Sequence, residues 1–216
     1  MTTSREQILE MVASGKISAA EGETLLEALR PKRRWRWLAA PFERLAAPRA
    51  LALGAAGAAA GLLFSRFHIR FDGAFDIHTS RAAVTLRQAL TDQLVSWPLP
   101  ALVLWAAARV RATQARIVDV VANVGVARLP LLWVALVVAL LHDRLPKSPV
   151  DRSPGAMAVV LVLAVLSLPA IVYAVILLYR AFRAASGLRG ARAGITFTLG
   201  VVTAEVISKL AIKVMG

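Results

Sequence analysis

The sequence of 216 residues contains no cysteine, and the residues and motifs of common enzyme sites are scarce. Without cysteine the chain cannot form disulfides, thiolate nucleophiles or cysteine-bound metal sites. Three histidines remain, and two of them, His68 and His78, share one loop. The Gly-x-Ser-x-Gly, His-Glu-x-x-His and phosphate-binding glycine-rich lysine motifs do not occur. We therefore expect no enzyme activity, no metal site and no cofactor.

Acidic residues are also few: 13 Asp and Glu stand against 26 Lys and Arg, for a net charge of +13. Such a surplus is found in nucleic-acid-binding proteins, which gather basic residues and exposed aromatics on one soluble face. In this chain most basic residues instead lie before Arg49 or just outside an apolar run. That distribution is typical of the positive-inside bias of membrane proteins, so we expect no nucleic-acid partner.

Apolar residues make up 58% of the chain and occur in long runs. Soluble domains contain roughly 45–50% apolar residues, and a membrane-spanning helix needs about 20 of them in succession. The sequence therefore predicts an all-α membrane protein with five transmembrane helices. The third run carries Asp119 and Arg128, and its uncharged part alone is too short to cross. The predicted spans are residues 49–67, 94–110, 117–141, 157–179 and 195–215.

Residues 1–30 are predicted to form a separate helical hairpin, joined by a linker at 31–48 to the transmembrane domain at 49–216. Ser4 can cap the first helix, and Gly15 can end it in the left-handed conformation. Ser18 and Glu21 have the spacing of a capping box at the start of a second helix, which Pro31 ends. Two such short helices have little core, so we expect the hairpin to contact another surface.

The hairpin sequence resembles the SHOCT-like helical hairpin found at the ends of many bacterial proteins. The resemblance implies a module for protein contacts and not an activity. It is carried by Ile8-Leu9-Glu10-Met11-Val12-Ala13-Ser14-Gly15-Lys16-Ile17-Ser18, then Glu21, then Leu25-Leu26-Glu27-Ala28-Leu29.

The linker is basic and aromatic, which suits the headgroup layer of a membrane, where Trp is half buried and Arg meets anionic lipid. It can act as a plain topological anchor or as a specific lipid pocket. The predicted lipid-interface residues are Arg33, Arg34, Trp35, Arg36 and Trp37.

The loops predict an orientation, because two of them are basic without acids and the other two are mixed. The basic loops lie between spans two and three and between spans four and five, on the same side as the N-terminus. We therefore expect a cytoplasmic N-terminus and an external C-terminus. Heavy use of Ala and Arg is typical of high-GC bacteria and indicates the bacterial inner membrane. The basic loops contain Arg109, Arg111 and Arg116, and Arg180, Arg183, Arg189 and Arg192.

The first outer loop is predicted to form a short β-hairpin, because apolar and polar residues alternate on either side of Asp72-Gly73. A three-residue turn at 72–74 would align Ile69 with Ile77 on one apolar face. We expect that face to lie on the membrane or on a partner. Thr79 or Ser80 then caps a helix that leads to Trp97.

Ionisable residues inside spans are the first candidates for function. Glu205 and Lys209 lie four residues apart and can pair on one face of the fifth span. The functional alternative is an ion or proton path with Arg128, and the structural alternative is a buried pair. If the pair is only structural, removing both residues should restore folding. Asp119 can meet the basic loops. Close helix packing is expected at Gly54, Gly57 and Gly61.

Residues 40–216 resemble bacterial members of the Yip family (Ypt-interacting protein family). The resemblance implies five spans, an inner N-terminus and no catalytic residues. Since some relatives accompany ABC exporters, it also implies an accessory or scaffold subunit of an inner-membrane complex. The alternative is a small transporter or channel. Partners would be lipids, other membrane subunits or a second copy. The motifs are Phe71-Asp72-Gly73, Asp92-Gln93-Leu94-Val95-Ser96-Trp97-Pro98-Leu99-Pro100-Ala101, Asp119-Val120-Val121 and Ala127-Arg128-Leu129-Pro130-Leu131-Leu132.

Overall fold

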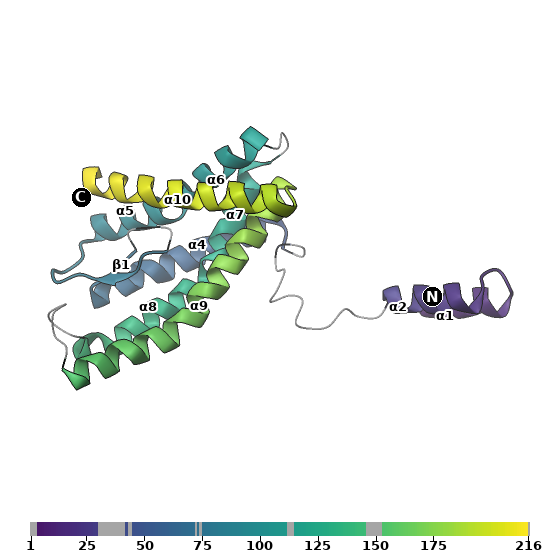
Figure 1. The fold of residues 1–216 in the computed structure, drawn as a ribbon, viewed down its shortest axis with the longest axis horizontal. Coiled ribbons are helices and arrows are strands. Elements are labelled where there is room, and N and C mark those ends of the chain that lie inside the picture. The colour runs from purple at the N-terminus through teal and green to yellow at the C-terminus, as the bar shows by residue number, and fades with distance from the viewer. Residues whose placement is uncertain are drawn as a thin grey trace. The chain divides into compact units, whose positions relative to one another are not determined.

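The computed structural model describes residues 4–29, 42, 45–71, 73, 75–111, 115–145 and 153–215 (Figure 1). The chain divides into two compact units, Met1–Pro41 and Phe42–Gly216. We call them the hairpin unit and the membrane unit. The five predicted lipid-interface residues, from Arg33 to Trp37, lie outside the described residues.

The hairpin unit consists of α1 (Ser4–Ala13) and α2 (Ala19–Leu29). Gly15 has a φ of +71°, and the predicted capping box forms: Ser18 N donates to Glu21 Oε2 at 2.8 Å, and Glu21 N donates to Ser18 Oγ at 3.3 Å. Gly22 allows α2 to approach α1, because a Cβ there would lie 2.3 Å from Val12 Cγ2. The predicted cap at Ser4 lies outside the described side chains.

The membrane unit contains α4 (Ala47–Phe64), α5 (Leu86–Ser96), α6 (Pro98–Arg111), α7 (Ile117–Ala127), α8 (Leu129–Leu141), α9 (Pro154–Ser186) and α10 (Gly190–Met215). Short 3₁₀ turns follow α4 at η2 (Ser65–Phe67) and α8 at η3 (His142–Arg144). Among the described residues, four continuous segments are long and apolar enough to cross a membrane: Ala47–Phe67, Ile117–Arg144, Pro154–Ser186 and Gly190–Met215.

The predicted count of five such helices is not borne out, because the second predicted span is two shorter helices. α5 ends at Ser96 and α6 begins at Pro98, with Trp97 between them. Proline fits the first turn of a helix, where its missing N–H is not needed, but it disfavours helix continuation through the preceding residue. The 14 residues of α6 extend about 21 Å, less than the ~30 Å of a hydrocarbon core.

The third predicted span is the centre of the membrane unit. α7 and α8 follow each other with a break at Arg128, and they lie between α4 and α9 (Figure 1). In the most apolar window of Ile117–Arg144, 50% of the positions are buried, against 11% in that of α9. The α7–α8 segment therefore packs against protein, whereas most of α9 presents apolar side chains outward, as a lipid-facing helix does.

The predicted strand register is wrong. β1 (Ile69–Arg70) and β2 (His78–Thr79) pair antiparallel, with Ile69 opposite Thr79. The predicted apolar face also does not point to lipid or a partner, since Ile69 and Phe71 are buried against residues of α8. Burial on α8 fixes this segment more strongly than its local alternation does.

The cap of α5 is also displaced from its predicted place. Thr85, not Thr79 or Ser80, precedes α5 and forms a capping box with Gln88. The structure places the start of α5 beside the C-terminal end of α10, where Thr85 and Met215 line one cavity. At the opposite end of the membrane unit, α9 joins α10 (Figure 1).

Candidate functional site

The predicted glycine positions of α4 are sites of close helix contact. A Cβ at Gly54 would lie 3.0 Å from the Cα of Gly125 on α7, and one at Gly57 would lie 2.6 Å from Leu129 Cδ2. A Cβ at Gly61 would lie 2.5 Å from Nε2 of Gln93 on α5. Gly54, Gly57 and Gly61 therefore form one packing face of α4 toward α5, α7 and α8.

Trp97, at the break between α5 and α6, covers the closest point of this contact. A Cβ on either Gly54 or Gly125 would lie 2.8 Å from the Trp97 ring. The indole Nε1 donates a hydrogen bond of 2.9 Å to the carbonyl oxygen of Val121. Trp97 therefore takes part in both the helix break and the glycine contact. No local sequence pattern predicts that these two features meet.

Arg128 lies at the break between α7 and α8, beside a small cavity. The cavity has a volume of about 20 Å³, and its walls include Gly61, Gln93, Trp97 and Arg128. Since one water needs roughly 10–15 Å³, the cavity has room for about one. Nη1 of Arg128 is buried and has no hydrogen-bond partner among the described residues.

The charged residues of α10 join the loop after β1. Glu205 Oε1 lies 3.7 Å from Lys209 Nζ, as their spacing predicts. Lys209 also binds Asp76, which was expected only to be part of an outer loop. Gly73 makes room for Glu205, because a Cβ there would lie 2.6 Å from its Oε1.

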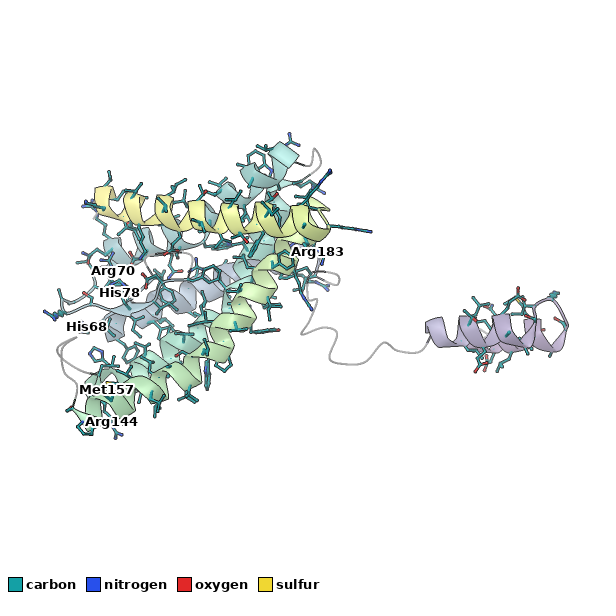
Figure 2. All side chains as sticks on the ribbon, in the orientation of Figure 1. His68, Arg70, His78, Arg144, Met157 and Arg183 are labelled. Carbon is teal, nitrogen blue, oxygen red and sulfur yellow. The ribbon has the colours of Figure 1, made fainter. Side chains whose placement is uncertain are left out.

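The most buried ion pair among the described residues, between Arg70 and Asp92, was not predicted. Arg70 on β1 donates from Nε to Asp92 Oδ2 at 2.9 Å and from Nη2 to Oδ1 at 2.7 Å. The Asp92 residue, on α5, is 1% exposed. Figure 2 labels Arg70 at the end of the membrane unit that carries the C-terminus, far from Arg183 at the opposite end. A polar residue on the buried face of a helix was the available sequence signal, but its partner lies 22 residues away.

The remaining predicted sites make local or unexpected contacts. Asp119 lies 3.9 Å from Nε of Arg116, three residues earlier, in an exposed pair. The ring of His68 stacks on that of His142, with centroids 5.7 Å apart, and not on His78. In the part of the chain that the structure describes, no group of three or more His, Asp or Glu side chains could hold a metal ion.

The arrangement is therefore suited to holding elements together. The Arg70–Asp92 pair joins β1 to α5. The Asp76–Lys209 pair joins the loop between β1 and β2 to α10. Ser208 adds a 3.4 Å hydrogen bond from α10 to the carbonyl of Val95 on α5. Each of these polar contacts joins two elements within the same unit.

Comparisons with known proteins bear on the hairpin unit. A SHOCT-like domain model matches residues 3–34, which confirms the N-terminal resemblance. No curated protein and no solved structure matches the chain significantly. The resemblance of residues 40–216 to the Yip family gains no support from these comparisons.

Proposed function

We propose that this chain is a non-enzymatic membrane adaptor, in which the membrane unit is an anchor and the SHOCT-like hairpin contacts another protein. The observation that carries the proposal is the match of residues 3–34 to a SHOCT-like domain, ahead of a unit with four helices of membrane-spanning length. Leu9 and Leu25 support a contact role, because they are 50% and 41% exposed on a hairpin too small for a large core of its own.

The interior of the membrane unit favours an anchor over a transporter. Glu205 is paired with Lys209, and Lys209 with Asp76, so these charges already have partners within the chain. An exporter subunit as partner rests on the Yip resemblance alone, so the proposal extends only to a protein partner.

We also propose that α5 and α6 together cross the membrane as a broken helix. α5 begins beside Met215 at one end, and α6 packs against Phe182 and Phe197 near the junction of α9 and α10 at the other. This crossing would place the basic loops and the N-terminus in the cytoplasm and the C-terminus outside. A reporter at Arg189 should then be cytoplasmic, and reporters at Ser148 and after Gly216 external. An external signal at Arg189 contradicts the topology.

The adaptor function is tested by crosslinking and purification of the full chain from its native membrane. Leu9→Gln with Leu25→Gln should leave the yield of membrane protein unchanged while lowering recovery of a crosslinked partner. The control is Glu10→Gln, which places the same side chain at a neighbouring exposed position. Equal recovery from all variants, with a partner present, would show that the hairpin is not the contact.

The alternative is a transporter or channel that uses Glu205, Lys209 and Arg128. The buried, unpartnered Nη1 of Arg128 beside a water-sized cavity is the observation that favours it. Ion or proton flux in liposomes distinguishes the two functions. Flux that Glu205→Gln abolishes, while the chain stays folded, would favour transport over the adaptor.

A further inference from the structure

A second cavity lies at the end of the membrane unit where α5 begins and α10 ends. Its volume is about 130 Å³. The polar wall comes from Arg70, Arg87, Gln88 and Thr91, and Ile212 and Met215 of α10 form an apolar wall. Since one water needs roughly 10–15 Å³, this space takes a group of several heavy atoms.

The polar wall supplies positive charge and hydrogen-bond donors. Asp92 balances the charge of Arg70 and holds its guanidinium in place through two bonds. Arg87 has no ion pair or hydrogen bond among the described residues, so it provides the net positive charge of the wall. These groups suit an anion with several acceptor oxygens.

The start of α5 adds further hydrogen-bond donors and positive charge to the cavity. Gln88 Oε1 is occupied by its bond from Thr85 N at 3.0 Å, so its amide nitrogen keeps its donors. The backbone N–H groups of Leu86 and Arg87, in the first turn of this 11-residue helix, have no partner within the helix. The positive end of the helix dipole therefore acts together with Arg87.

The apolar wall indicates where such an anion would come from. Ile212 and Met215 belong to the last turn of α10, a helix long and apolar enough to cross a membrane, and Met215 is 45% exposed. The cavity therefore lies at the end of such a helix, at the level where a bilayer has its headgroups. A phosphate in the cavity could thus remain attached to acyl chains that run along α10. We propose that this cavity binds a phosphate group, supplied by the headgroup of an anionic phospholipid.

The test is native mass spectrometry of the full chain in mild detergent, with phosphatidylglycerol or phosphatidylcholine of the same acyl chains added. We expect preferential retention of phosphatidylglycerol. Arg87→Gln should lower that retention about fivefold, the change that ~1 kcal/mol per basic residue near a membrane surface corresponds to. Arg81→Gln is the matched control, because Arg81 is exposed in the preceding segment and does not line the cavity.

Thr91→Met is a second variant, which fills the cavity without changing charge and should also lower retention. A separate arm adds inorganic phosphate alone and measures thermal stability. If phosphate stabilises the chain in an Arg87-dependent way while the lipids do not differ, the phosphate site stands and its source is a soluble phosphate. Equal losses in Arg81→Gln and Arg87→Gln, or no difference between the two lipids and no effect of phosphate, would overturn the proposal.

Discussion

The hairpin unit and the membrane unit differ in how far apart along the chain their stabilising contacts lie. In the hairpin unit, the capping box joins Ser18 to Glu21, and the turn at Gly15 lies directly between the two helices. In the membrane unit, Ser208 bonds to Val95 across 113 positions and Lys209 to Asp76 across 133. Local patterns therefore describe the first unit well, whereas the second depends on which distant elements meet.

The largest expected effect comes from a long-range ion pair whose carboxylate is buried. Asp92→Ala leaves Arg70 without its carboxylate, and breaking such a pair costs about 3 kcal/mol of unfolding free energy. Thermal unfolding in detergent measures the loss. The control is Asp119→Ala, whose pair with Arg116 is exposed and three residues apart, so less than about 1 kcal/mol is expected. Equal losses would show that the buried long-range pair contributes no more to stability than the exposed local pair.

A smaller loss is expected at the contact of α4 with α7. Gly125→Leu places a side chain where even a Cβ lies 2.9 Å from the Cα of Gly54, and overpacking of this kind costs typically 1–3 kcal/mol. Gly194→Leu is the control, because a Cβ at Gly194 meets nothing within 4 Å. The midpoint of thermal unfolding should fall for Gly125→Leu and stay near that of the unmodified chain for the control.

Removal of the Glu205 charge by Glu205→Gln should cost at most roughly 1 kcal/mol, because its pair with Lys209 is 3.7 Å long and partly exposed. The contacts also change the expectation for Glu205→Leu with Lys209→Leu. Because Lys209 also binds Asp76, the double variant leaves that carboxylate without its lysine partner. We expect it to be less stable than Glu205→Gln; full restoration of unfolding stability would show that the network is only the local pair.

The smallest effect concerns the hairpin unit and pH. Bonds to Glu21 from the backbone N–H of Ser18, and then from its hydroxyl, hold the pKa of this carboxyl below its ordinary value of 4.5. Because the folded pKa is the lower one, this contribution is present above pH 4.5 and is lost as pH falls through the folded pKa. A carbon-13 NMR titration of the Glu21 carboxyl measures it. Ser18→Ala should return the pKa toward 4.5, and an unchanged pKa would refute the assigned cause.

Several features of this protein follow from the sequence alone. Long apolar runs predicted helices that are long and apolar enough to cross a membrane, since roughly 20 successive apolar residues are needed to bury a helix in lipid. The pair Ser18 and Glu21, the turn at Gly15 and the pair Glu205 and Lys209 were predictable because their partners lie within four residues. The glycines of α4 were predicted to allow close helix packing, but the sequence did not show which helices they contact.

The tertiary structure decided the rest, for reasons that act between distant residues. Trp97 separates α5 from α6 and closes over Gly54 and Gly125, so the run at 94–110 is not one continuous helix. Burial of Ile69 and Phe71 on α8 overrode the register that their local alternation predicted. Sequence patterns report the apolar and polar faces of one element, whereas packing and ion pairing depend on which faces the fold brings together.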